Sequence, residues 1–199
     1  PVTFVARSPA TVTLTADNQP GQLLGQTYGL PQTLRWTSTN VVPGSCVSTG
    51  VDSFTITGGA SNGSVSTAPL VKEFSNYKIR CTALPTAING SGEIGGPVES
   101  PVTIGVKDPV LSCAPNKTTA NVGNTITYTP TVTPSDPPSG TGNYSFAWTS
   151  TGATPSSFTS TPTVLSYSVT YASANTYSAS LTLTAPGGRS VPATCTSAT

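Results

Sequence analysis

The sequence predicts an all-β protein made of two tandem β-sandwich domains. Apolar and polar residues alternate in short runs bounded by turn residues, which is typical of half-buried antiparallel strands. The length of 199 residues is about twice that of a single sandwich of ~100 residues. With 35% hydrophobic residues and only 8% charged residues, the chain can bury two modest cores and lacks the high charge of disordered chains.

Six strands are expected in the first half, each an alternating run between turn clusters such as residues 58–63 and 89–92. The one segment of helical composition, Ala68–Phe74, is too short for a stable helix. The predicted strands are Val2–Ala6, Thr11–Ala16, Thr33–Thr37, Asp52–Thr57, Asn76–Thr82 and Pro101–Val106.

Six more strands are expected in the second half on the same grounds, with turn-rich segments at residues 134–142 and 185–188. They are Val110–Cys113, Asn124–Thr133, Tyr144–Thr149, Val164–Tyr171, Thr176–Thr184 and Arg189–Thr196. The domain boundary is placed at Lys107-Asp108-Pro109, where a strand ends, two charges meet and a proline restarts the chain. The predicted domains are residues 1–107 and 108–199.

The cysteines predict two disulfides and an oxidising compartment, because the four of them fall two in each half. Structural zinc is the competing interpretation. It is disfavoured because the chain has no Cys-x-x-Cys spacing and no His. We therefore expect a secreted protein at the cell surface, with Cys46, Cys81, Cys113 and Cys195 all in intradomain disulfides.

Each half contains one Trp in a similar local sequence, Leu-Arg-Trp-Thr-Ser-Thr around Trp36 and Phe-Ala-Trp-Thr-Ser-Thr around Trp148. Alternation places each Trp on the same face as the apolar residue two positions before it, which predicts a core position. Truncating such a buried Trp to Ala costs roughly 3–5 kcal/mol. An exposed Trp that stacks on a sugar is the functional alternative.

Three stretches of the first half carry a family pattern: Gln-Thr-Leu-Arg-Trp-Thr-Ser-Thr-Asn at residues 32–40, Cys46, and Tyr-Lys-Ile-Arg-Cys-Thr at residues 77–82. With them the first half resembles the immunoglobulin-like repeats of large bacterial surface proteins. The resemblance implies an Ig-like, Greek-key β-sandwich in which Cys46 pairs with Cys81.

The second half has its own family pattern, in the stretches Val122–Thr125, Tyr144–Trp148 and Ser173–Tyr177. In these stretches it is similar to PKD-like and related Ig-like repeats of prokaryotic cell-surface proteins. We assign Tyr177 to the core together with the two Trp residues. In this half, a Cys113–Cys195 disulfide would join the first strand to the last.

No enzymatic activity, cofactor or metal is expected. Without His there is no Ser-His-Asp triad, the seven acidic residues lie mostly in predicted turns, and no Asp-x-Asp cluster suggests calcium. The net charge of +1 without a basic stripe argues against nucleic acid as a partner. No apolar stretch approaches the ~20 residues of a membrane span, so direct membrane insertion is not expected. Because the chain starts at Pro1 and has no Met, we expect a processed protein or a piece of a longer one.

Two kinds of covalent modification are considered. Four sequons, at Asn62, Asn89, Asn116 and Asn143, lie in or beside predicted turns and are candidate glycosylation sites. An isopeptide bond would need a buried Lys beside an acid. Lys78 is the one candidate on a strand, and a solvent-facing Lys78 is the expectation.

The leading hypothesis for function is a structural module of an extracellular appendage or surface stalk, such as a filament or pilus subunit, that associates with identical subunits or neighbouring repeats. Subunits could join by donation of a strand that carries Val2, Phe4 and Ala6 on one face; otherwise this run is the first strand of its own domain. The alternative is cell adhesion or carbohydrate binding. A glycan or host-surface ligand would then contact loops at residues 41–45 and 134–142 and stack on Tyr28, Tyr144 or Tyr171.

Overall fold

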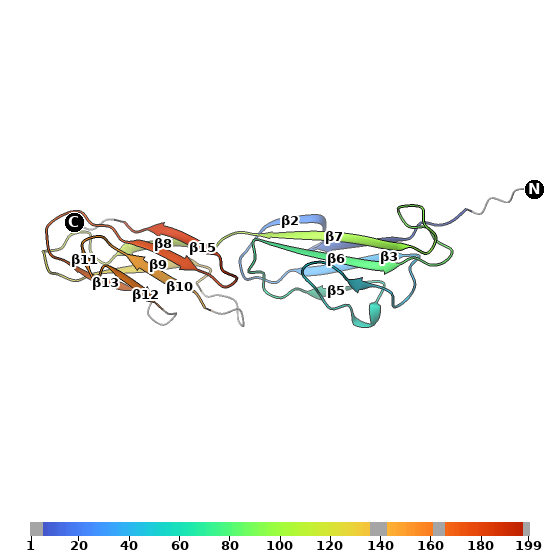
Figure 1. The fold of residues 1–199 in the computed structure, drawn as a ribbon, viewed down its shortest axis with the longest axis horizontal. Coiled ribbons are helices and arrows are strands. Elements are labelled where there is room, and N and C mark those ends of the chain that lie inside the picture. Colours follow the sequence, from blue (N-terminus) through green and yellow to red (C-terminus); the bar gives the residue numbers. More distant parts are fainter. Residues whose placement is uncertain (1–5, 136–142, 161–165, 197–199) are drawn as a thin grey trace, which may run out of the picture. The chain divides into compact units, whose positions relative to one another are not determined.

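The computed structural model describes residues 6–135, 143–160 and 166–196, which fall into two compact units (Figure 1). Unit 1 comprises residues 1–107 and unit 2 comprises residues 108–199. Their regular secondary structure is almost entirely strand, and the helix of the described part is the 3-10 turn Thr57–Gly59. No helix in the described ranges is long and apolar enough to cross a membrane.

Unit 1 is a sandwich of two sheets that share one strand. Strand β2 (Gln19–Gln26) pairs with β1 (Thr11–Ala16) at its start and then runs parallel to β7 (Pro97–Val106), so it passes from one sheet to the other. The resulting strand order is β4-β6-β7-β2-β1-β3-β5. The remaining strands are β3 (Thr33–Thr39), β4 (Val47–Ser48), β5 (Gly63–Ser66) and β6 (Phe74–Thr82).

Unit 2 is a sandwich of two separate four-stranded sheets, ordered β12-β10-β14-β15 and β11-β13-β9-β8. Successive strands such as β9 and β10 lie in different sheets, and β9 pairs both with its predecessor β8 and with the distant β13. This is the Greek-key connection of immunoglobulin-like sandwiches. The strands are β8 (Val110–Pro115), β9 (Ile126–Thr133), β10 (Ser145–Thr149), β11 (Ala153–Thr154), β12 (Ser157–Ser160), β13 (Tyr167–Tyr171), β14 (Ser180–Thr184) and β15 (Ser190–Thr194).

The predicted strand Asp52–Thr57 is wrong, because this segment crosses the side of the sandwich instead of extending a sheet. The Asp52 carboxylate accepts hydrogen bonds from Lys72 Nζ and from the backbone N–H of Asn76, at 2.6 and 2.7 Å. The Phe54 ring then lies between the two sheets, 5.7 Å from the Trp36 ring and 6.2 Å from the Tyr77 ring. Alternation in this stretch therefore reflects the packing of one half-buried aromatic side chain and not the pairing of a strand.

Strand β2 was not predicted, since its sequence Gln-Pro-Gly-Gln-Leu-Leu-Gly-Gln reads as a turn-rich segment. The short strands β4, β5, β11 and β12 were also missed. Of the predicted first strand, Ala6 is exposed and lies in no strand, whereas Val2 and Phe4 lie outside the described residues.

Both Trp residues are in the cores, 4% exposed for Trp36 and 1% for Trp148. The Trp36 indole N–H donates to the Ala60 carbonyl at 2.9 Å, and Gly63 lies so close to the ring that a Cβ there would come within 2.6 Å of it. Trp148 stacks on Tyr167 at 5.6 Å, and its indole nitrogen has no hydrogen-bond partner in the part of the chain that is described. The prediction that Tyr177 belongs to the core is wrong: it is half-buried at the surface, as described below.

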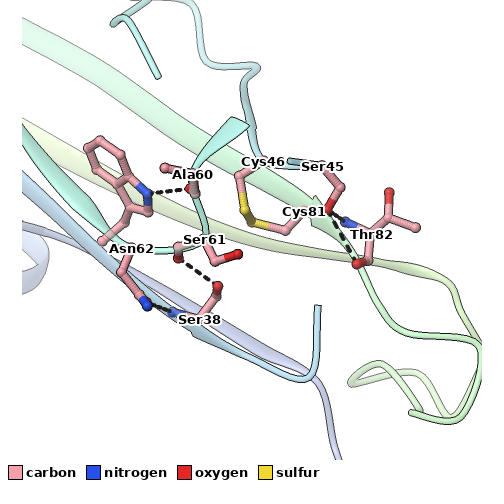
Figure 2. Close-up of a disulfide and its surroundings, with 9 residues drawn as sticks. Ser38, Ser45, Cys46, Ala60, Ser61, Asn62, Cys81 and Thr82 are labelled. Carbon is pink, nitrogen blue, oxygen red and sulfur yellow. Dashed lines mark hydrogen bonds between the residues drawn. A yellow bond between two sulfur atoms is a disulfide. The ribbon is translucent and has the colours of Figure 1, made fainter. Parts of the chain in front are cut away.

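The structure contains the disulfides Cys46–Cys81 and Cys113–Cys195, one in each unit. Cys46 immediately precedes β4, and the β4–β6 register places it directly opposite Cys81 within a single sheet. Figure 2 shows this bridge beside the segment that contains Ala60, Ser61 and Asn62, where the Ser38 hydroxyl donates to the carbonyl of Ser61. Unlike an antibody disulfide, the bond therefore does not cross the core.

The second disulfide instead joins the two sheets of unit 2. Cys113 lies on β8 at the edge of one sheet, and Cys195 follows β15 at the edge of the other. The bond closes a loop with a sequence separation of 82 residues, compared with 35 for the bond in unit 1. It therefore links the first and last strands of this sandwich.

Replacing both Cys113 and Cys195 with Ala is expected to lower the free energy of unfolding of unit 2 by about 4 kcal/mol, because the long loop regains its entropy in the unfolded state. Hydrogen exchange followed by mass spectrometry measures the two units separately. Peptides of unit 2 should exchange faster and those of unit 1 should not change. Equal loss of protection in both units would contradict independent stabilisation.

Candidate functional site

The three tyrosines expected to stack on a ligand are buried. Tyr28 is 1% exposed, Tyr144 4% and Tyr171 5%. The Tyr144 hydroxyl donates to the Pro134 carbonyl at 3.2 Å, so its polar end is held by the protein. None of these rings is available to stack on a sugar in this structure, which removes the residues on which that interpretation depended.

Tyr128 and Tyr171 instead belong to a buried hydroxyl network inside unit 2. Their hydroxyls are 3.3 Å apart, and Ser150 Oγ lies 2.7 Å from the Tyr171 hydroxyl and donates to the Ser178 carbonyl at 2.9 Å. Burial, with the hydrogen bond to Tyr171 as a second cause, raises the pKa of Tyr128 well above its ordinary value of 10. Burial likewise raises the pKa of Tyr167. The network holds neutral hydroxyls and has a structural role.

Tyr177 lies between β13 and β14 and forms a corner of the sandwich. Its hydroxyl donates to the Ser173 carbonyl, four residues earlier, at 3.0 Å, and its ring stacks on Tyr171 with centroids 3.8 Å apart. A Tyr that reaches back to the chain just before a strand is the tyrosine corner of immunoglobulin-like domains. The sequence singled out residues 173–177, but Tyr177 locks a loop and does not fill the core.

Acidic side chains of both units are engaged in local structural contacts. Lys78 pairs with Glu99 at 3.0 Å between neighbouring strands, and both side chains are partly exposed. In unit 2, Arg189 of the β14–β15 turn pairs with Asp108. Among the residues that the structure describes, no group of three or more Cys, Asp or Glu side chains could hold a metal.

The sequon at Asn89 is built into a turn and does not present its side chain to solvent. Asn89 is 6% exposed, its amide oxygen accepts from the N–H groups of Ser91 and Glu93, and its amide nitrogen donates to Glu93 and to the Pro97 carbonyl. A sugar on that nitrogen would break the turn. Asn89 is therefore withdrawn as a glycosylation candidate for the folded chain.

The other three sequon residues, Asn62, Asn116 and Asn143, are exposed. Asn62 uses only its amide oxygen, which accepts the backbone N–H of Ser38 at 2.7 Å (Figure 2). Asn116 does the same with Thr127 at 2.9 Å. These contacts leave the sugar-accepting nitrogen pointing away from the bonded backbone, so glycosylation at these positions stays a prediction.

The sheet edges are the remaining candidate sites, because an unpaired edge can bind another strand. The edge at β4 is only two residues long. Beyond it, Thr49 N donates to the Lys78 carbonyl and Asp52 N to the Asn76 carbonyl, so the register shifts by one residue. Such a bulge turns an edge away from further pairing.

The two edges formed by β8 and β15 in unit 2 are also protected. The backbone N–H of Ala185 donates to the Arg189 carbonyl, so the odd-numbered residues of β14 and β15 direct their N–H and C=O groups toward each other. Pro192, which pairs with Thr182, therefore lies at a position whose backbone groups face away from β14, and as a proline it has no N–H to offer there. The Cys113–Cys195 bond holds β8 beside this strand.

The edge at β5 in unit 1 has neither a proline, a charge nor a bulge. The backbone N–H of Thr67 donates to the Gln32 carbonyl, so in the β3–β5 register Val65 and Gly63 face β3. Because antiparallel residues alternate, Ser64 and Ser66 direct their N–H and C=O groups outward. Both are exposed, and β5 ends the described sheet order. Two further edges end the sheets of unit 2: β11, which is two residues long and is followed by Pro155, and β12, after which the chain continues into residues outside the described ranges.

The chain is similar to two-domain regions of several solved structures. It has 15% identity to the titin domains Z1Z2 in complex with telethonin, with a TM-score of 0.34 over 93% of this chain and 96% of that one. It has 13% identity to the fibronectin(III)-like modules of Clostridium thermocellum CbhA, with a TM-score of 0.29 over 92% of each chain. It has 15% identity to the Yersinia pseudotuberculosis adhesin InvE, with a TM-score of 0.32 over 92% of this chain and 58% of that one.

No family model matches the chain, and no curated protein matches it. At such low identities and TM-scores, no property of those proteins extends to this one. The assignment of two immunoglobulin-like sandwiches follows from the strand orders, the registers and one disulfide in each unit.

Asn89→Ala should destabilise unit 1 by roughly 2–4 kcal/mol, because it leaves two backbone N–H groups, a carbonyl and a carboxylate without their partners. Asn62→Ala is the matched control, since it removes a single exposed contact and should cost about 1 kcal/mol or less. Urea denaturation of both variants measures the difference. Equal effects would show that the Asn89 turn does not matter for stability.

Alkaline pH should destabilise unit 2. The pKa of Tyr128 is raised in the folded state, so its stabilising contribution is complete below pH 10 and is lost as pH rises further, when the unfolded chain releases the proton first. The free energy of unfolding should fall between pH 10 and pH 11. Tyr128→Phe should reduce this fall in the free energy of unfolding by about 1 kcal/mol. An unchanged fall in urea titrations at the two pH values would contradict the assignment.

Proposed function

We propose that this chain is a structural module of an extracellular appendage or surface stalk of a prokaryotic cell, either a filament or pilus-type subunit or a slice of a multi-repeat surface protein. In this proposal the second unit is a PKD-like repeat and the chain has no enzymatic activity. Its partners are identical subunits or neighbouring repeats.

The observation that carries the proposal is how the interaction groups are distributed. The three tyrosines that were expected to stack on a ligand are buried, whereas an uncharged sheet edge at β5 is exposed. An open edge offers main-chain hydrogen bonds along a strand, which favours association with another polypeptide over capture of a small molecule.

Composition and covalent structure support the same proposal. A chain with eight basic and seven acidic residues has weak electrostatic self-repulsion, so subunits can pack closely. Two buried disulfides, one in each unit, favour an oxidising location outside the cytoplasm. An adhesin or carbohydrate-binding module is the competing function, and it loses the support of Tyr28, Tyr144 and Tyr171.

Negative-stain electron microscopy of the protein isolated from its native source tests this proposal. We expect regular filaments, and a chain without residues 1–6 should keep its circular dichroism spectrum but fail to polymerise. The fold should survive because Ala6 is outside the described strands, while residues 7–10 are held by Pro85 and Ile88. Isolated particles that bind immobilised glycans would instead support the competing function.

A further inference from the structure

We propose that the free edge of β5 in one copy of the chain accepts residues 1–6 of a second copy as an added strand. This inference rests on the proposed function, because it names the joint between subunits of the appendage. The donor segment, Pro-Val-Thr-Phe-Val-Ala, carries no charge and continues as an alternating run.

The backbone of β5 can take part in such a ladder. Ser64 and Ser66 point their N–H and C=O groups away from β3, as the hydrogen bond from Thr67 N to the Gln32 carbonyl requires. A second check comes from the other side of β3, where Asp17 N donates to the Thr33 carbonyl. Odd-numbered residues of β3 thus face β1 and even-numbered residues face β5, in agreement with the first assignment.

The margin of the core beside β5 is apolar and only partly covered. Val65 lies opposite the buried Leu34 and shares its face of the sheet, yet it is only half-buried. Phe54, also half-buried, packs on the Trp36 ring, against which Gly63 of β5 lies. A strand added at β5 would place alternate side chains over this margin, and Val2, Phe4 and Ala6 are the apolar set of the donor segment.

The segment cannot reach the β5 edge of its own chain. Arg7 donates to the Pro85 carbonyl, and Leu84 N donates to the Asn40 carbonyl, so this point lies beyond the end of β3. Ser64, the nearer of the two outward-facing residues, is level with Arg35, roughly 16 Å away along the strand, and two strand spacings add about 10 Å across the sheet, or about 19 Å in all. Five extended residues span at most about 17 Å, so the partner must be a second copy.

A joint of this kind uses a different surface on each partner. Residues 1–6 of one copy meet β5 of the next, which leaves a free donor on one copy and a free acceptor on the other. Such heterologous contacts repeat into an open filament when the rotation between copies does not close a ring.

Ser64→Pro removes one outward N–H from the acceptor edge while leaving the bonds to β3 in place, since proline is tolerated at such edge positions. We expect it to abolish filaments in electron micrographs, with an unchanged circular dichroism spectrum and thermal midpoint. Ser66→Pro provides a second variant of the same design. Thr194→Pro is the matched control, because Thr194 occupies the equivalent outward position on β15, and it should leave filaments intact.

Disulfide trapping identifies the two partners directly. All four native cysteines are paired, so a Thr3→Cys chain and a Ser64→Cys chain each carry a single free thiol. Under mild oxidation an equimolar mixture should give at least tenfold more crosslinked dimer than either chain alone. Thr194→Cys replaces Ser64→Cys in the control mixture, which should give only background.

The outcomes separate the acceptor from the wider proposal. Filaments that persist in Ser64→Pro, or crosslinks to Thr194→Cys as strong as those to Ser64→Cys, overturn β5 as the acceptor and leave the structural role standing. Dimers of Ser64→Cys alone at the level of the mixture would show β5 pairing with β5, which also overturns it. Absence of both filaments and crosslinks in the otherwise wild-type chain rejects the structural role and this joint together.

Discussion

The alternation of backbone hydrogen-bonding groups along each strand is the constraint on which this structure depends. Successive residues of a strand direct their N–H and C=O groups to opposite sides, so a strand either pairs with two neighbours or forms an edge with unpaired groups. In unit 1, β2 meets this demand by pairing first with β1 and then with β7. The Asp17-Asn18 turn, with both residues at positive φ, reverses the chain and makes this double use of β2 possible.

The two units meet the same packing demand with different devices. Trp36 is covered by Phe54 and by the Ala60 carbonyl, both on segments outside the strands of the sheets. The Cys46–Cys81 bond is tied to the same covering segment, because the backbone N–H of Cys46 donates to the carbonyl of Gly59, next to Ala60, at 3.3 Å. Gly59 approaches Gly44 so closely that a Cβ would come within 2.0 Å of its carbonyl oxygen, so glycine is required there. In unit 2, stacked aromatic rings around Tyr167 fill the core, and the disulfide ties sheet to sheet.

Alternation and turn residues were sufficient to predict most of the long strands. The bounds of Thr11–Ala16 agree with β1, and β3, β6, β8, β9 and β10 lie close to their predicted ranges. Strand β2 was missed because its two glycines and one proline are typical of turns. In the structure both glycines have positive φ, and the strand changes sheet along this stretch. Asp52–Thr57 was overpredicted because a segment that buries one aromatic ring alternates like a strand. For the sites, the family resemblance singled out Tyr177 and the sequon motif singled out Asn89, but only hydrogen-bond partners show that one locks a corner and the other a turn.

The edges show most clearly what a sequence leaves undetermined. Pro192 and Ser64 are both edge residues, yet a proline in a strand can be read as a defect, and a Gly-Ser-Val-Ser run as a loop, until the register is known. Once the ladders are in phase, Pro192 occupies the outward position that blocks pairing, and Ser64 occupies the outward position that permits it. Protection of one edge and exposure of another within a single chain, with so few charges to keep copies apart, support the proposal that copies associate through one strand.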